Sequence, residues 1–158
     1  MKRILLILAA MAIAAPGWSG AQAGNATPYQ GTRVIKTASA YSALTQRLMK
    51  AIRKNHMGIV ARASATIGAK SIGVTMPGNM VIMVFRPDLA VRMLKASVPA
   101  GIEAPLQFYV TENDDGSAIR TYRPPSSVFA PYDSPDLNRL AGEIDIVFEK
   151  IVRDALIP

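Results

Sequence analysis

Apolar residues at helical spacing predict the first helix of the chain. In residues 42–55, apolar side chains recur every four positions from Leu44 to Ile52, and charged side chains occupy the opposite side. This pattern is typical of a helix with one buried face. Ser42 is its expected cap and Gly58 its expected stop.

Two further helices are predicted to begin at prolines. Pro87 suits the first position of a short helix over residues 87–96, where a backbone N–H is not needed. Ser134 and Pro135 supply a cap and a first-turn proline for the last helix. Its apolar stripe runs to Ala155, which predicts a helix of about 22 residues, or ~33 Å.

Five segments are predicted to be strands. Residues 33–38 form a short candidate, and residues 59–65 alternate as a half-buried strand does. Residues 80–85 are apolar on both faces. Residues 106–112 and 117–123 flank the sequence Asn-Asp-Asp-Gly, which is a strong signal for a hairpin.

The order of these elements, β-α-β-β-(short α)-β-β-α, predicts an α+β fold. One mainly antiparallel sheet is expected to pack on helices. Residues 68–73 are expected to form a turn or a short helical piece, and residues 124–133 a Pro/Ser loop. The connections are short, so we expect a single domain over residues 32–158.

The apolar strand at residues 80–85 predicts self-association. One set of its side chains is expected to face the helices: Val81, Met83 and Phe85. The other set would face solvent: Met80, Ile82 and Val84. A face this apolar is typical of an interaction surface, so we expect a homodimer that buries it. The competing expectation is that the Pro/Ser loop, with Val128 and Phe129, folds over this face within one chain.

The first 23 residues have the three parts of a secretory signal peptide. Met1-Lys2-Arg3 is a basic start, residues 4–15 are an unbroken apolar run, and the segment ends Ala21-Gln22-Ala23. As a helix the run would span only ~18 Å, which is less than the ~30 Å of a bilayer core. We therefore expect cleavage after Ala23, a flexible leader over residues 24–31, no transmembrane segment after cleavage, and location in the periplasm.

The two halves of the expected mature chain differ in charge. Residues 24–87 contain nine basic residues and no carboxylate, whereas residues 88–158 contain eleven acidic and seven basic residues. This asymmetry favours either an anion-binding face or two halves that interleave and pair their charges. Interleaving is the simpler interpretation, because a compact fold mixes its halves.

Composition excludes many kinds of active site. The chain has no cysteine and one histidine, which excludes disulfides, thiolate nucleophiles, Cys-ligated zinc and any site that needs two imidazoles. The sequence around Lys70 lacks the glycines of a phosphate-binding loop, and no Gly-x-Ser-x-Gly motif is present. We therefore predict no catalytic residue, no cofactor and no metal site, with His56 at a basic helix end rather than in a metal site.

Four residues are candidates for ligand binding. Lys70 lies between glycines and could hold a small anion, and Arg86 ends a strand. Arg120 and Tyr122 share one strand face and could line a polar pocket. These residues favour a small anionic ligand. Nucleic acid is not expected, because the chain has an export signal and lacks a basic cluster with interleaved aromatic residues.

The order and spacing of several short motifs resemble the domain-of-unknown-function 302 family across nearly the whole mature chain, roughly residues 34–156. The matching residues are Ala69-Lys70-x-x-Gly73, Val84-Phe85-x-Pro87, Met93, Pro99, Pro105-Leu106, and Glu112 to Gly116 followed by Tyr122. The resemblance implies a small α+β fold, often dimeric, with no established catalytic residues. Members commonly show Gly-Asn-Pro after the third strand, where this chain has Phe85-Arg86-Pro87.

Three functions follow as hypotheses. The leading one is a non-catalytic envelope protein that binds a small ligand or a protein partner. The second is an enzyme with carboxylate or lysine chemistry that the sequence does not localise. The third is a copper accessory protein that binds copper(I) through methionine thioethers, although the same methionines fit core positions.

Overall fold

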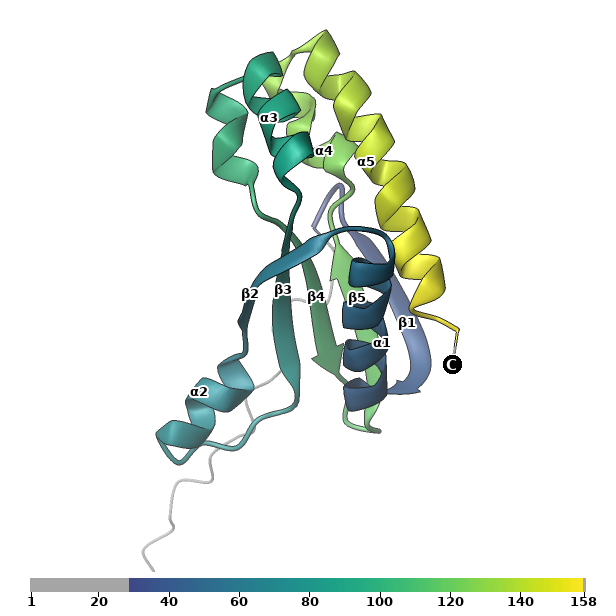
Figure 1. Ribbon diagram of the computed structural model, residues 1–158. Helices are drawn as coiled ribbons and strands as arrows, with labels where there is room; N and C mark the ends of the chain where they lie inside the picture. Colours follow the sequence, from purple (N-terminus) through teal and green to yellow (C-terminus); the bar gives the residue numbers. More distant parts are fainter. Residues whose placement is uncertain (1–28, 158) are drawn as a thin grey trace, which may run out of the picture.

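The computed structural model describes residues 29–157, and it contains one five-stranded antiparallel sheet with strand order β1-β5-β4-β3-β2 (Figure 1). The strands are β1 (Arg33–Ala40), β2 (Gly58–Ala63), β3 (Asn79–Phe85), β4 (Leu106–Glu112) and β5 (Ser117–Tyr122). The helices are α1 (Tyr41–Lys54), α2 (Ala65–Ser71), α3 (Pro87–Ala96), α4 (Pro125–Phe129) and α5 (Pro135–Asp154), with short 3-10 helices η1 (Pro99–Glu103) and η2 (Ala130–Tyr132).

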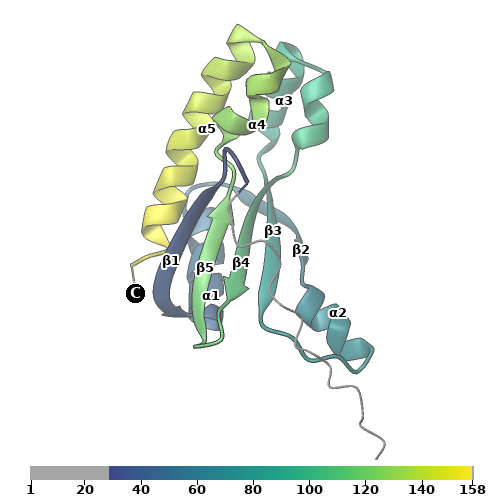
Figure 2. The same ribbon diagram turned by 180° about the vertical axis from the view of Figure 1, so that it is seen from behind.

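The α+β fold predicted from the sequence is confirmed. Helices α1 and α5 lie on one side of the sheet, while α3 and α4 gather at one end of it and α2 projects from the other end (Figure 1). From behind, the strands lie in front of α1 and no helix crosses them (Figure 2). Within residues 29–157, helices therefore cover the sheet on one face only. None of the helices within residues 29–157 is long and apolar enough to cross a membrane.

The core lies between the sheet and the two long helices. Alternate residues of β3 and β4 point toward the helices, and among them Ile82 and Phe108 have no exposed surface. Phe108 stacks on Phe148 of α5 with ring centroids 4.6 Å apart. The predicted apolar stripe of α1, from Leu44 to Ile52, is also fully buried, which is what an amphipathic helix requires on the face of a sheet.

The prediction for the faces of β3 was wrong. Ile82 and Val84 are buried under the helices, while Val81 and Met83 are only half-buried on the uncovered side. Register decides this orientation, because Ile82 lies opposite Phe108 of β4 and opposite residues of paired strands share a face. Residues 80–85 are apolar on both faces, so their own pattern does not distinguish the two orientations.

The ends of α1 also differ from the prediction. The helix begins after Ala40, which makes no side-chain cap bond, so Ser42 lies inside the helix. It ends at Lys54, and its stop is His56 rather than Gly58, because His56 adopts the left-handed conformation with φ of 58°. The N–H groups of His56 and Met57 donate to the carbonyls of Arg53 and Ile52, respectively, which is the Schellman arrangement.

Strand β2 lies at the edge of the sheet, and this explains why it is not half-buried as predicted. In this strand only Ile59 is partly buried, and the pairing with β3 is irregular between Ile59 and Ala61. The strand ends at Ala63, and Ser64 then caps α2 by accepting from the Ile67 N–H at 3.3 Å. The expected short helical piece is therefore a helix that begins three residues earlier than predicted.

The segment expected to be a Pro/Ser loop contains α4 and η2. Both Val128 and Phe129 of this segment are buried. The Ser126 N–H donates to Asp145 Oδ1 of α5 at 3.0 Å, so the segment packs against α5 at the end of the sheet and leaves the middle of the uncovered face open (Figure 2).

The basic and acidic halves of the chain interleave. Strand β1 pairs with β5, and β3 pairs with β4, so each half contributes strands throughout the sheet. Lys54 of α1 forms an ion pair with Asp154 of α5, with Nζ 3.2 Å from Oδ1. The charge asymmetry of the sequence is therefore not a division of the molecule into two separate regions.

Gly78 is predicted to be required for the contact between β3 and α1. A Cβ atom at this position would lie 2.6 Å from the Tyr41 ring and 2.8 Å from Glu112 Oε2. We expect Gly78→Ala to lower the free energy of unfolding by about 1–3 kcal/mol through overpacking. Gly68→Ala is the matched control, because nothing lies within 4 Å of its Cβ position and alanine favours a helix. Urea unfolding of both variants tests this, and equal effects would contradict it.

Candidate functional site

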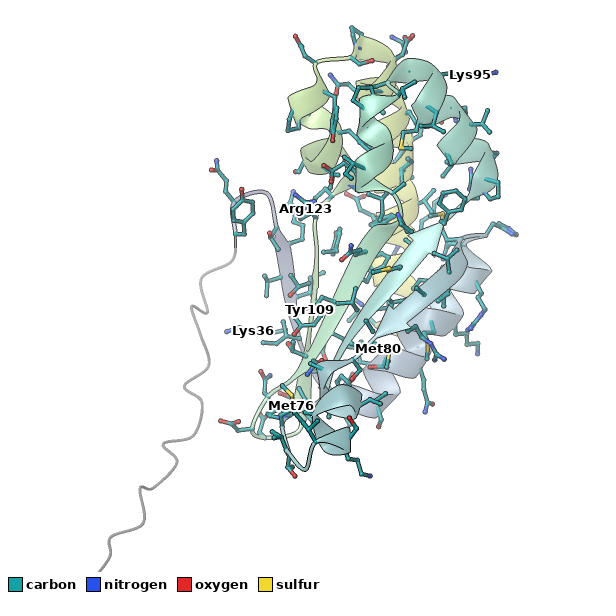
Figure 3. All side chains as sticks on the ribbon, turned by 90° about the vertical axis from the view of Figure 1, so that its left-hand side faces the viewer. Lys36, Met76, Met80, Lys95, Tyr109 and Arg123 are labelled. Atoms are coloured by element: carbon teal, nitrogen blue, oxygen red, sulfur yellow. The ribbon has the colours of Figure 1, made fainter. Side chains whose placement is uncertain are left out.

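The uncovered face of the sheet is mixed in character. Its side chains, from β1 across to β2, include Val34, Lys36, Ile119, Thr121, Tyr109, Gln107, Val81, Met83 and Ala61. Tyr109, near the middle, is 40% exposed. Lys36, Tyr109 and Arg123 lie on the same side of the sheet (Figure 3). Both apolar contact and hydrogen bonding are therefore available on this face.

A groove of about 350 Å³ lies where this face meets η1. Gln107, Tyr109 and Thr121 contribute polar atoms to it, and Met83 and Ile102 contribute apolar surface. At its edge, Arg123 Nη2 is 3.3 Å from Glu103 Oε2. The hydroxyl of Tyr132 donates to the other oxygen of Glu103 at 3.0 Å. Concave surfaces with a few polar groups among apolar side chains are typical of ligand sites.

Arg120 is the most unusual residue of the core. It lies on the face of β5 that is covered by the helices and has no exposed surface. None of its three guanidinium nitrogens has a hydrogen-bond partner among the described residues. Burial lowers the pKa of Arg120 to about 10, and the nearby Tyr122 opposes this shift. The side chain therefore carries a full positive charge at pH 7 in an apolar environment.

Tyr122 connects Arg120 with the groove. It lies two residues from Arg120 on the same face of β5, and it also contributes to the wall of the groove. Its ring packs against Phe108 and Phe148, with centroids 5.5 and 6.0 Å away. Burial raises the pKa of Tyr122, and the negative charge of Glu149 adds to that shift. Of the four predicted ligand residues, only Arg120 and Tyr122 are brought together.

Lys70 and Arg86 lie at opposite ends of the sheet. Lys70 is exposed on α2, next to the start of β3, whereas Arg86 follows the last residue of β3. The strand between them spans about 20 Å. Arg86 also holds Asp88 through two hydrogen bonds of 2.8 and 3.0 Å. The structure therefore does not place these two residues in one site with Arg120.

The carboxylates with lowered pKa values lie outside the groove. Hydrogen bonds from Arg86, Arg92 and Asn55 lower the pKa values of Asp88, Glu143 and Asp154, respectively. Arg92 joins α3 to Glu143 of α5, and Asn55 joins the end of α1 to Asp154 of α5, so these ion pairs and hydrogen bonds have a structural explanation. Within residues 29–157, no three His, Asp or Glu side chains form a cluster that could hold a metal ion.

The methionines considered for copper are dispersed. Met57 and Met93 are buried in the core. Met80 and Met83 occupy opposite faces of β3, and Met76 lies between α2 and β3. No observation in the described part of the chain therefore favours copper binding or catalysis over simple binding.

Apart from Tyr122, sequence reasoning did not identify the residues that line the groove or hold its edge. Arg123, Glu103 and Tyr132 come from three elements that the fold brings together. Only Tyr109 carried a signal, because a tyrosine on a strand with alternating burial points to the side opposite Phe108 and Val110.

These features define a small α+β protein with an antiparallel sheet, helices on one face and a groove on the other. The chain belongs to the DUF302 family, a domain of unknown function, whose family model matches residues 34–155. It is similar to the crystal structure of an uncharacterised conserved DUF302 protein from Bacillus stearothermophilus. The TM-score is 0.72 and the identity 16%, and the match covers 80% of this chain and 99% of the other. No curated protein matches the sequence.

Arg120→Met is predicted to stabilise the protein. Because burial lowers the pKa of Arg120 from its ordinary value to about 10, the unfolded chain binds the proton more tightly than the fold does, and the buried charge destabilises the fold at every pH below 10. At ~1.4 kcal/mol per pKa unit, removing this charge should raise the free energy of unfolding at pH 7 by up to about 3 kcal/mol.

The sign of this effect can be tested by varying pH. The parent regains stability as pH rises above 10, so the advantage of Arg120→Met in urea unfolding should be smaller at pH 10.5 than at pH 7. Arg123→Met is the control, since its exposed ion pair is worth at most about 1 kcal/mol. A destabilised Arg120→Met variant would contradict the prediction.

Proposed function

We propose that the protein is an exported, non-catalytic binding protein of the bacterial envelope, and that the uncovered sheet face is its binding surface. The observation that carries this proposal is the groove of about 350 Å³ between this face and η1. Sheets of this kind need one covered face only, so the uncovered face is available for a partner without any change of fold.

Two features of the groove favour a small anionic ligand. Arg123 lies at its edge with about half of its side chain exposed, so its guanidinium is accessible despite the ion pair with Glu103. The hydroxyl and amide groups of Tyr109, Gln107 and Thr121 supply hydrogen bonds to a polar head group. Met83 and Ile102 then offer apolar contact to the rest of such a ligand.

A second copy of the chain is proposed to cover the remainder of the uncovered face. Val34, Val81 and Ile119 present apolar side chains there, and Tyr109 is well suited to an interface. This homodimer differs from the one expected from sequence alone, because Val81 and Met83 replace Ile82 and Val84 as the contact residues of β3.

The homodimer can be tested by sedimentation equilibrium at micromolar concentration. We expect the parent protein to have twice the mass of one chain. Tyr109→Glu should convert it to a monomer, because a buried carboxylate without a partner is costly in an interface. Ile146→Glu on α5 is the matched control, since Ile146 is 55% exposed and lies outside the sheet. A monomeric parent would disprove the dimer.

Export can be tested independently of binding. The signal peptide predicted for residues 1–23 lies outside the described residues, so the proposal rests on its sequence pattern. Expression of the full chain in a Gram-negative host should give a periplasmic product whose first residue is Gly24. An intact Met1 on protein in the cytosolic fraction would overturn the proposed location.

A further inference from the structure

Arg120 lacks every usual source of compensation for a buried charge. Its neighbours across the sheet are Ile35 of β1 and Val110 of β4, which offer no hydrogen-bond acceptor from their side chains. In the described part of the chain, Tyr122 is the only titratable neighbour that affects its pKa. Buried charges in proteins are normally paired, so the fold retains a guanidinium where leucine or methionine would pack without this cost.

The chemistry of Arg120 defines the kind of ligand that would compensate its charge. A single guanidinium carries one positive charge, so a monoanion compensates it. The planar fork of arginine matches a carboxylate through two parallel hydrogen bonds. The residues opposite Arg120 across the sheet, Ile35 and Val110, are apolar, so the rest of such a molecule would be apolar as well.

The groove approaches this charge as far as Tyr122, and Arg120 itself does not line it. Tyr122 contributes to the groove wall and lies two residues from Arg120 on the same face of β5, a separation of about 7 Å along the strand. Displacement of the Tyr122 ring would place the carboxylate of a ligand near Arg120, while Met83, Ile102 and Val128 contact its apolar part in the groove.

We infer that Arg120 is the anchoring charge of a binding site for a monocarboxylate with an apolar body, which enters from the groove past Tyr122. This inference rests on the proposal that the protein is a binding protein, and it assigns the class of ligand. It also assigns the recognition of the carboxylate to the core residue Arg120 rather than to the exposed Arg123.

Calorimetric titration with octanoate, and with octanol as the uncharged analogue, tests the site at pH 7. We expect one octanoate to bind per chain, and octanol to bind at least about tenfold more weakly, because only octanoate compensates the guanidinium. Arg120→Met should lose this discrimination. Arg139→Met on α5 is the matched control, because Arg139 is exposed and does not line the groove; it should bind octanoate within about threefold of the parent.

A second variant keeps the test decisive if Arg120→Met fails to fold. Arg120→Lys keeps the charge without the planar fork, so it should bind octanoate more weakly than the parent and still prefer it to octanol. Equal binding by parent and Arg120→Met, or no binding of octanoate by the parent, would overturn the inference.

The alternative is that an acidic residue of the chain itself pairs with Arg120, and this alternative predicts a different result. Glu149 lies beyond Tyr122, where it affects the pKa of that tyrosine. If Glu149 reached Arg120, Glu149→Gln would destabilise the protein and the parent would not bind octanoate, which would also overturn the inference. The dimer measured by sedimentation does not depend on Arg120, so failure of the ligand inference and failure of the proposed binding face are distinguishable.

Discussion

The packing of α1 and α5 on one face of the antiparallel sheet is the constraint on which the rest of the structure depends. Side chains alternate along each strand, so a sheet with helices on one face needs large apolar residues on that side only. Phe108 and Ile82 therefore meet the helices, while Tyr109 and Val81 lie on the other side. The same alternation that fills the core leaves a mixed surface available for binding.

The same rule places Arg120 in an environment that does not suit it. Alternation along β5 puts Ala118, Arg120 and Tyr122 on the core side, and only Arg120 is charged. A charged residue in an apolar core, on a strand whose other core-facing residues are uncharged, is more often part of a functional site than a structural element. The conflict also limits stability, because the charge cannot be released without deprotonation near pH 10.

Local signals in the sequence predicted the fold where they were unambiguous. Pro87, Ser134 and the turn before Ser117 each fix an element boundary by backbone chemistry alone, and the structure has these boundaries as predicted. The faces of β3 could not be predicted, because both are apolar and only the register with β4 selects one. The groove could not be predicted from the sequence for a similar reason. Glu103 and Arg123 are twenty residues apart, and only the fold brings them together.

Function in this family must be sought in such long-range arrangements rather than in the fold. A protein with 16% identity has the same architecture, so the architecture tolerates wide changes of sequence and does not specify a ligand. In this chain, β5 places a charge on its core side. Arg120 faces the core, and the next residue, Thr121, faces the groove. Since successive residues of a strand point to opposite sides, a single strand presents a buried charge and a solvent-facing surface within a few ångströms.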